Sequence, residues 1–265
     1  MQNKKQRIAA ISAILVQHPN QLYSLTHFEK LFGAAKSSIS EDLAVIRKTL
    51  EEGGGGTLKA VAGPRGGVRF LPLMAQEEKQ SLMNELIGRM SDISRFLPGG
   101  YVYLADLFYT PGYVDGMARI MAEWFYESKA DFVTTVETKG IPLAVSVARI
   151  LNLPVAVARR ENKPTDGPVY SINYLSGSSR RLQTMSLSRR MVKEGARALV
   201  IDDFISGGGT LRAVNDLLSE FKVEVCGTGV AVVNQYPQKK KIKQFNALFL
   251  LEELSETRID IKQYE

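Results

Sequence analysis

Residues 198–210 read Ala-Leu-Val-Ile-Asp-Asp-Phe-Ile-Ser-Gly-Gly-Gly-Thr, and they are the most informative segment of the 265-residue chain. The four apolar residues at its start predict a buried strand. Two adjacent carboxylates follow, then a loop of small residues, and then residues 211–218 with the apolar spacing of a helix. A strand, a glycine-rich loop and a helix in this order bring backbone N–H groups to the positive end of the helix dipole, where an anion binds.

The residue types in this loop predict a sugar phosphate as the ligand. Glycines leave room for the backbone to curl around a phosphate, and the flanking hydroxyls add donors. The paired carboxylates are placed to accept hydrogen bonds from vicinal ribose hydroxyls. The loop lacks the lysine that precedes the Ser or Thr of a Walker A loop, which argues against the γ-phosphate of a nucleoside triphosphate. The predicted contacts are Asp202, Asp203, Ser206, Gly207, Gly208, Gly209 and Thr210.

A second loop predicts another part of the same site. The apolar segment 132–136 predicts a strand, and Glu137, Thr138, Lys139 and Gly140 follow it at the start of a predicted helix. Backbone N–H groups are again presented at a helix N-terminus, and Lys139 adds a positive charge. All four residues are therefore candidate ligand contacts.

Net positive charge is concentrated near the N-terminus. The chain has a formal charge of +6, and residues 1–73 account for +5 of it, with ten Lys and Arg against five Asp and Glu. A basic region of this kind favours a polyanionic partner, although a basic face can also be simply solvated.

The order of predicted elements in this basic region is typical of a winged helix. Apolar spacing predicts a first helix over residues 8–15, and Ser24 caps a second one. A capping box of Ser38 and Glu41 predicts the start of a third helix. Two segments of alternating apolar and polar residues then predict a hairpin. Two helices joined by a glycine-containing turn and followed by a hairpin form a helix-turn-helix with a wing.

A winged helix of this composition predicts DNA binding. The third helix enters the major groove, and the wing touches phosphate or the minor groove, with Arg65 at its tip. A winged helix that binds protein instead is the alternative, which the basic excess disfavours. The candidate DNA contacts are Lys36, Ser37, Ser38, Ser40, Arg47, Lys59 and Arg65.

The remainder of the chain alternates predicted strands and helices. This alternation favours an α/β domain with a doubly wound, mainly parallel sheet. Leu71-Pro72-Leu73 marks the boundary, and residues 75–96 predict one long helix after it. Ligands of such sheets bind beyond the carboxyl ends of the strands, where the connectivity reverses, and both candidate loops are expected there.

Two further groups of residues are open to two interpretations. Charged and small residues around a short strand near 171–181 predict a mobile hairpin over the pocket. Arg160 and Lys163 precede it, and they either close on the ligand or are solvated loop charges. The run Lys239–Lys243 is either a second DNA-facing patch or, as such runs more often are, a solvated loop.

Composition disfavours several other classes of protein. No apolar stretch reaches the ~20 residues of a membrane helix, and the basic start lacks a signal-peptide cleavage site, so a cytoplasmic location is expected. A single cysteine, Cys226, allows no internal disulfide. Two histidines are too few for a histidine-based metal site, so no metal site is predicted.

The paired acids before a loop ending in Gly-Gly-Thr resemble the phosphoribosyl pyrophosphate (PRPP) signature of type I phosphoribosyltransferases. The loop Glu137–Gly140 is similar to their pyrophosphate loop, although Lys139 replaces the more common arginine. Together with the winged helix and the stretches 171–181 and 183–187, these motifs make the whole chain resemble the bacterial purine operon repressors built on a phosphoribosyltransferase fold. The resemblance implies a winged-helix DNA-binding domain over residues 1–73 and a phosphoribosyltransferase-like domain for effector binding and dimerisation over residues 74–265.

The resemblance also implies a function. It is that of a homodimeric, DNA-binding repressor of purine biosynthesis and transport genes, with no catalytic residue and no cofactor. PRPP, with Mg²⁺, is implied as an inducer that lowers DNA affinity, and the anion chemistry of the pocket admits a guanine polyphosphate nucleotide at the same site. The alternative is a purine phosphoribosyltransferase with an appended DNA-binding domain, which nucleotide formation from a purine base and PRPP would reveal.

Overall fold

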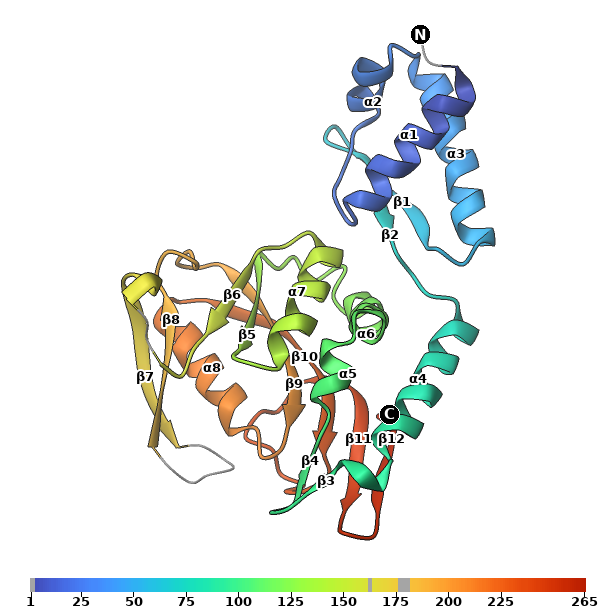
Figure 1. The fold of residues 1–265 in the computed structure, drawn as a ribbon. Helices are drawn as coiled ribbons and strands as arrows, with labels where there is room; N and C mark the ends of the chain where they lie inside the picture. Colours follow the sequence, from blue (N-terminus) through green and yellow to red (C-terminus); the bar gives the residue numbers. More distant parts are fainter. Residues whose placement is uncertain (1–2, 162–163, 176–181) are drawn as a thin grey trace. The chain divides into compact units, whose positions relative to one another are not determined.

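The computed structural model describes residues 3–161, 164–175 and 182–265 (Figure 1). Lys163 and residues 176–181, which the sequence analysis singled out, lie outside the described residues. The chain divides into two compact units, Met1–Lys79 with Arg149–Asn152, and Gln80–Ala148 with Leu153–Glu265.

The N-terminal unit has the element order expected of a winged helix. Helices α1 (Lys4–Gln17), α2 (Leu25–Phe32) and α3 (Lys36–Glu52) precede an antiparallel pair of strands, β1 (Thr57–Val61) and β2 (Gly67–Leu71). All three helices and the hairpin contribute buried side chains to a single apolar core, which holds the four pieces together. Its members include Ile11, Leu15, Phe28, Ile39, Ile46, Leu58 and Phe70.

The start of α2 agrees with the sequence, whereas the start of α3 does not. Ser24 Oγ accepts a hydrogen bond from the backbone N–H of His27, as expected of an N-cap. Helix α3 begins earlier than predicted, since the N–H of Ile39 already donates to the carbonyl of Ala35. Ser38 therefore lies inside the first turn, and the predicted capping box of Ser38 and Glu41 is wrong.

The single helix predicted over residues 75–96 is in fact broken. Helix α4 ends at Met90, and Asp92 then caps a short 3-10 helix by accepting from the N–H of Ser94. Gly99 and Gly100, with φ of 91° and 76°, turn the chain into a small hairpin. The elements of this region are α4 (Gln76–Met90), the 3-10 helix (Ile93–Arg95), β3 (Phe96–Leu97), β4 (Tyr101–Val102), α5 (Ala105–Tyr109) and α6 (Pro111–Glu123).

A six-stranded sheet in the order β12-β11-β10-β9-β5-β6 forms the centre of the second unit. Its strands are parallel except for the pair β11 and β12, which is antiparallel. The predicted class, a doubly wound and mainly parallel sheet, is confirmed. The strands are β5 (Phe132–Val136), β6 (Val155–Ala158), β9 (Arg197–Ile205), β10 (Glu224–Asn234), β11 (Asn246–Leu254) and β12 (Ile259–Gln263).

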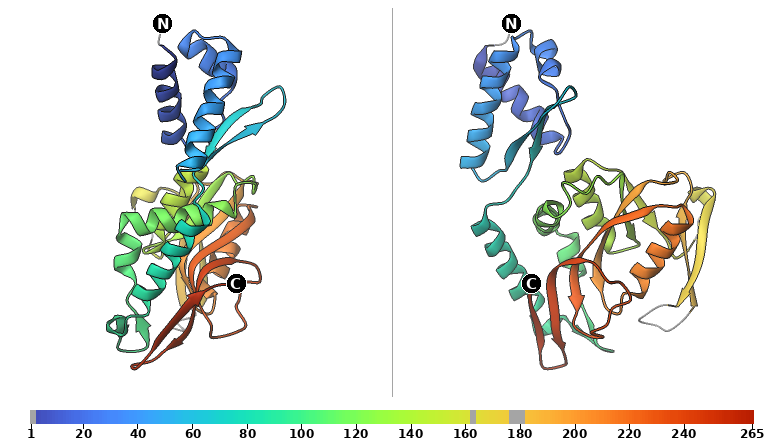
Figure 2. Two further views of the ribbon diagram at one scale, coloured as in Figure 1. Left: turned by 90° about the vertical axis from the view of Figure 1, so that its right-hand side faces the viewer. Right: turned by 180° about the vertical axis from the view of Figure 1, so that it is seen from behind.

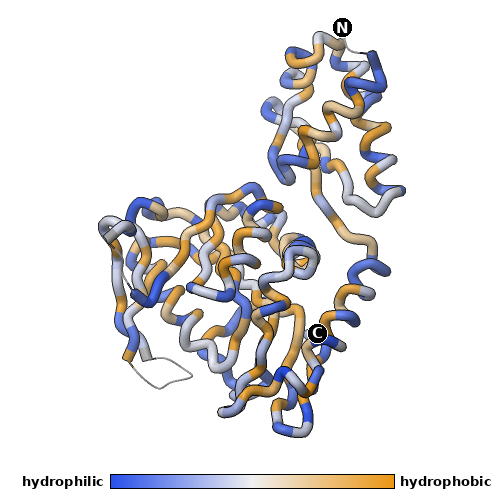
Figure 3. The backbone as a smooth tube through the Cα atoms, viewed as in Figure 1, coloured by the Kyte–Doolittle hydropathy of each residue, from blue (hydrophilic) through white to orange (hydrophobic). Residues whose placement is uncertain are grey.

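Helices cover both faces of this sheet. A Cβ placed on Gly229 would lie 3.0 Å from both Met121 in α6 and Phe125 just after it, so α6 packs on that face. The opposite face packs against α8 (Gly209–Glu220), whose Leu217 shares an apolar core with Val230. Buried apolar residues follow the central strands, and Figure 3 shows the same concentration as orange segments of the tube. Helix α7 (Gly140–Leu151) connects β5 to β6.

The hairpin predicted to be mobile is packed onto α8 in its described strands. Strands β7 (Val169–Leu175) and β8 (Leu182–Ser188) pair with each other and lie beside α8 in all views (Figures 1 and 2). Met185 is completely buried, and the ring of Tyr170 meets Phe221 edge to face at 4.5 Å. The described strands are therefore anchored on α8, and mobility of the hairpin stays a prediction.

Candidate functional site

The two loops predicted to bind a ligand follow adjacent strands. Strand β5 pairs with β9, with Thr134 opposite Val200. From β5 the chain continues to β6 on one side, whereas from β9 it continues to β10 on the other. The reversal of connectivity therefore falls between β5 and β9, and ligands of open α/β sheets bind at that point, beyond the carboxyl ends of the strands. Both candidate loops begin there.

The paired acids lie inside a strand rather than directly after it, where the sequence analysis placed them. Strand β9 continues to Ile205 because β10 continues beside it, with Val230 opposite Asp202 and Val232 opposite Phe204. Asp202 is only 6% exposed and Asp203 is half-buried. The predicted end of the strand at Ile201 is wrong, and the correction fixes both carboxylates on rigid backbone.

Burial makes ionisation of this pair costly. It raises the pKa of Asp202 well above its usual range, and the neighbouring Asp203 charge raises it further. Burial also raises the pKa of Asp203, although a hydrogen bond from Asp202 and the charge of Lys139 counteract this effect. Burial therefore favours the protonated form of the pair.

Two of the cations predicted for this site, Lys139 and Arg160, lie close enough to influence the acid pair. The charge of Lys139 lowers the pKa of Asp203, and the charge of Arg160 lowers that of Asp202. Both side chains are exposed, so they remain accessible to a ligand. Lys139 and Arg160, which come from different loops, are thus brought to one place.

Gly140 permits a close approach that no other residue would allow. A Cβ at this position would lie 2.5 Å from Asp202 Oδ1 and 2.5 Å from Thr135 Oγ1. The start of α7 consequently touches the acid pair directly. Thr135 Oγ1 is buried and has no hydrogen-bond partner among the described residues, a feature that the sequence analysis missed because Thr135 reads simply as part of an apolar strand.

Glu137 is engaged within the protein. Its Oε1 accepts a hydrogen bond of 2.8 Å from the backbone N–H of Arg160, and its Oε2 lies 3.7 Å from Arg159 Nη1. Arg159 also lies 3.6 Å from Asp166. Glu137 therefore holds the segment after β6 in place, whereas Thr138 and Lys139 beside it are exposed.

The loop before α8, residues 206–208, has the geometry of an anion cradle. Gly208 is the N-cap of α8 with φ of 77°, a value that favours glycine, and no side chain caps the helix. The N–H groups of the first turn are thus available to a ligand. Ser206 is exposed, and Thr210 is half-buried in the first turn of α8.

The candidate DNA contacts lie mostly on the surface of the N-terminal unit. Six of them are exposed, whereas Ser38 is half-buried. Lys36 lies 3.8 Å from Glu29 at the surface, a contact of small energy that DNA phosphate can replace. Arg65 is exposed in the wing between Gly63 and Gly66. The exposed candidates are Lys36, Ser37, Ser40, Arg47, Lys59 and Arg65.

Both halves of the chain match known protein families. Residues 3–72 match the family described as bacterial purine repressor, N-terminal, and residues 106–264 match the phosphoribosyl transferase domain. A Bacillus subtilis protein named purine biosynthesis transcriptional repressor PurR is 43% identical over 245 residues, which cover 92% of this chain and 86% of that protein.

The chain belongs to the PurR family. The Lactococcus lactis purine biosynthesis transcriptional activator PurR (strain IL1403) is 36% identical over 97% of this chain and 93% of its own length. These PurR relatives carry regulatory names rather than enzyme names, although one is named a repressor and the other an activator.

Solved structures support the fold of the second unit. A crystal structure of adenine phosphoribosyltransferase from Thermoanaerobacter pseudethanolicus superposes with a TM-score of 0.53, at 18% identity, and covers 63% of this chain and 98% of its own. This likeness concerns the fold alone. No helix among residues 3–161, 164–175 and 182–265 has the length and hydropathy needed to cross a membrane.

Proposed function

We propose that this chain is a DNA-binding transcriptional repressor of purine biosynthesis and transport genes, and that PRPP is the inducer that lowers its affinity for DNA. The observation that carries the proposal is the joining of two parts in one chain. One is a winged helix with exposed cations. The other is a phosphoribosyltransferase-like domain, with paired acids and two candidate anion loops where the strand connectivity reverses between β5 and β9. A homodimer would place two winged helices on a two-fold symmetric operator.

The site residues suggest how PRPP would bind. The vicinal ribose hydroxyls would donate to Asp202 and Asp203, and the 5′-phosphate would lie on the loop before α8. The pyrophosphate would contact Thr138, Lys139 and Arg160. A guanine polyphosphate nucleotide would compete for the same anion positions. Lys163 lies outside the described residues and stays a candidate.

Mg²⁺ would accompany PRPP rather than belong to the protein. No group of three or more His, Cys, Asp or Glu in the described part of the chain is arranged to hold a metal ion. We propose that the ion binds mainly to oxygens of the effector, because Mg²⁺ is commonly held by few protein ligands together with substrate phosphates, and that it neutralises part of the pyrophosphate charge.

Induction requires that effector binding favours a state with lower DNA affinity. Typical coupling free energies between two sites are about 1–3 kcal/mol, which correspond to changes of about 5- to 150-fold in affinity. The sign of regulation is taken from the Bacillus subtilis relative, which has the higher identity of the two PurR relatives described above.

The proposal is tested by fluorescence anisotropy of a labelled duplex from upstream of a purine biosynthesis gene, at fixed salt, with and without PRPP and Mg²⁺. We expect specific binding that PRPP weakens. Tighter binding in PRPP would indicate an activator-like response, and absence of specific binding would contradict a regulatory role. In the latter case, nucleotide formation from a purine base and PRPP would identify a transferase.

A further inference from the structure

The segment between β10 and β11 carries four lysines in five positions, Lys239, Lys240, Lys241 and Lys243. We call Lys239–Lys243 the lysine loop. The sequence left it either as a DNA-facing patch or as a solvated loop. Its backbone contacts assign it to a different neighbour, residues 206–210, which comprise the loop before α8 and the first two residues of that helix. We call residues 206–210 the phosphate-binding loop, after the role predicted for them.

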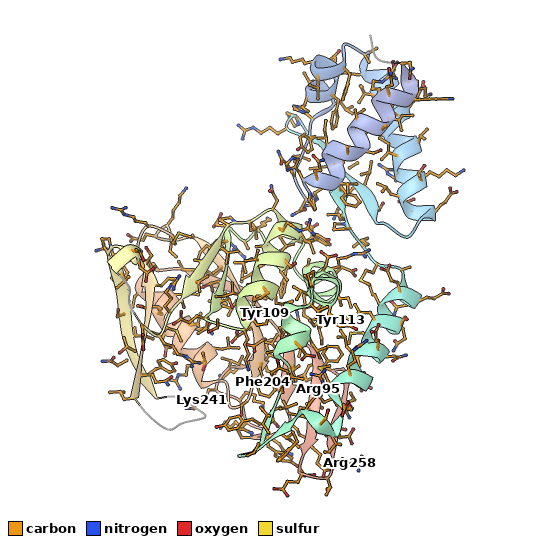
Figure 4. All side chains as sticks on the ribbon, viewed as in Figure 1. Arg95, Tyr109, Tyr113, Phe204, Lys241 and Arg258 are labelled. Atoms are coloured by element: carbon orange, nitrogen blue, oxygen red, sulfur yellow. The ribbon has the colours of Figure 1, made fainter. Side chains whose placement is uncertain are left out.

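The lysine loop is fastened to the phosphate-binding loop. The backbone N–H of Lys241 donates a 3.0 Å hydrogen bond to the carbonyl of Gly207. A Cβ on Gly208 would lie 3.3 Å from the same nitrogen, so the two loops are in contact. Ile242 is only 8% exposed and belongs to the core shared with α8, which holds the lysine loop in place. Figure 4 labels Lys241 at this point of the fold.

The lysines differ in whether their ammonium groups already have a partner within the protein. Lys240 Nζ donates to the carbonyl of Asn234, so this ammonium is already engaged. Lys239, Lys241 and Lys243 are exposed, and none has an ion pair with a carboxylate in the described ranges. Like charges this close repel one another, and an anion bound beside them relieves the repulsion.

The phosphate-binding loop, in contrast to the lysine loop, lacks positively charged side chains. Residues 206–210 contain no basic side chain, so a phosphate there is met only by backbone N–H groups, two hydroxyls and the helix dipole. The dipole is equivalent to about half a positive charge, whereas a phosphomonoester carries about −1.5 to −2 near neutral pH. A Walker A loop supplies the missing charge with its own lysine.

We propose that Lys241 supplies this charge from the neighbouring loop and clamps the 5′-phosphate of the effector. The inference rests on the proposed function and deepens it, since it names the residue that neutralises one end of the ligand. Lys139 and Arg160 act on the other end, at the pyrophosphate. The two ends of PRPP are thus held by cations from separate loops.

This division of labour gives a selective test. Full-length wild type and Lys241→Ala are compared by calorimetric titration with PRPP, ribose 5-phosphate and inorganic pyrophosphate, each with Mg²⁺. Removal of one ammonium beside a phosphate should weaken PRPP and ribose 5-phosphate by a common factor of about ten, equivalent to ~1.4 kcal/mol, and should leave pyrophosphate binding unchanged. Lys241→Arg should restore binding, because it retains the charge.

A matched control separates a local effect from net charge. Lys193 is exposed and precedes β9, at the opposite end of that strand from the phosphate-binding loop. Lys193→Ala removes the same charge and should change the affinity for none of the three ligands.

Three results would overturn the proposal. Unchanged affinity of Lys241→Ala for ribose 5-phosphate and PRPP would do so, and so would an equal loss for pyrophosphate, which would indicate general disruption. Weaker DNA binding with intact effector affinity would assign the lysine loop to DNA instead. If wild type itself binds neither PRPP nor ribose 5-phosphate, the proposed function fails together with this inference, which distinguishes that failure from the other three.

Discussion

At the scale of single residues, the main feature of the candidate site is its pair of adjacent, poorly solvated carboxylates. Asp202 and Asp203 are neighbours in a buried strand, so the protein holds two carboxylates where neither is well solvated. Such an arrangement costs stability, and functional sites commonly accept that cost. Under the proposed function, a ribose with two adjacent hydroxyls would satisfy both carboxylates at once.

Replacement of Asp203 should separate effector binding from DNA binding. Asp203→Ala removes an acceptor for a ribose hydroxyl, so PRPP affinity should fall by about tenfold or more, as for loss of a hydrogen bond to a charged group. DNA affinity without PRPP should be unchanged, and the variant should behave as a repressor that cannot be induced. Asp216→Ala, on the exposed face of α8, is the control. Loss of DNA binding in Asp203→Ala would contradict the assignment.

The raised pKa of Asp202 predicts a pH-dependent stability. Because the folded state binds the proton more tightly than the unfolded chain, stability falls as pH rises from the ordinary aspartic acid value near ~3.9 through the raised folded value. Asp202→Asn removes this titration. The variant should therefore have a higher Tm than wild type near neutral pH, and the difference should shrink as pH falls below ~4. A difference in Tm that is independent of pH would show that the carboxyl does not titrate in this way.

At the scale of elements, the wing and the third helix carry the DNA-binding hypothesis. Both are fixed by the core of the N-terminal unit, since Ile39 and Ile46 of α3 and Phe70 of β2 pack together in one cluster. Tyr23 adds a bridge to Val68 of β2, and Gly67 fits there because a Cβ would lie 2.2 Å from the carbonyl of Tyr23. The packed core therefore holds the exposed surfaces of the wing and α3 in fixed positions within this unit.

The wing should contribute to DNA affinity through phosphate contacts. Arg65→Ala should weaken DNA binding and reduce the slope of log K against log salt by about 0.9, the value for one phosphate contact with duplex DNA. PRPP affinity should stay unchanged. Anisotropy titrations over a range of salt concentrations give both quantities, and an unaltered affinity together with an unaltered slope would exclude the wing from the interface.

The N-terminal unit also contains a buried ion pair between α1 and α3. Arg7 Nε donates to Asp42 Oδ2, and the Asp42 side chain is completely buried while that of Arg7 is 12% exposed. Asp42→Ala leaves the arginine without its partner, so the free energy of unfolding of this unit should fall by about 3–5 kcal/mol. Urea titration measures the change.

A second ion pair between the same helices provides the control. Lys4 and Glu41 lie 3.5 Å apart, with side chains 56% and 70% exposed. Solvent screens such a pair, so Glu41→Ala should cost less than about 1 kcal/mol. Equal effects of Asp42→Ala and Glu41→Ala would show that burial of the first pair does not matter for stability.

At the scale of the whole molecule, two units with different chemistry lie in one chain. The N-terminal unit has the basic excess, whereas the second has the candidate anion loops and most of the buried core. Under the proposed function, communication between DNA and PRPP would appear as a coupling free energy between two separate sites.

This coupling should be reciprocal. The factor by which saturating PRPP weakens DNA binding should equal the factor by which saturating operator duplex weakens PRPP binding, because both measure the same thermodynamic cycle. The two factors are obtained from anisotropy of labelled DNA and from calorimetric titration of PRPP. Unequal factors would mean that the two ligands do not share one linked equilibrium, for example because the protein changes its state of assembly.

The sequence by itself determined the fold class, most of the order of elements and the residue types of the candidate site. Apolar periodicity identified β5 to the residue, and glycines with flanking hydroxyls predicted a candidate anion loop, which lies directly before α8. These features are local, because each depends on propensities and spacings within a few residues. Where local signals competed, as at the start of α3 and the end of α4, the boundaries were displaced.

Only the tertiary structure decided which distant residues meet. The pairing of β9 with β10 extended the strand through Asp202 and Asp203, and it thereby set their burial and their pKa. Packing of α7 against the acid pair explains Gly140, and contact between two loops brings Lys241 to Gly207. Burial and proximity arise from long-range packing, so a pattern of neighbouring residues cannot encode them directly. The sequence therefore specified the residue types of the candidate site, whereas the fold set the burial of these residues and the pKa of the acid pair.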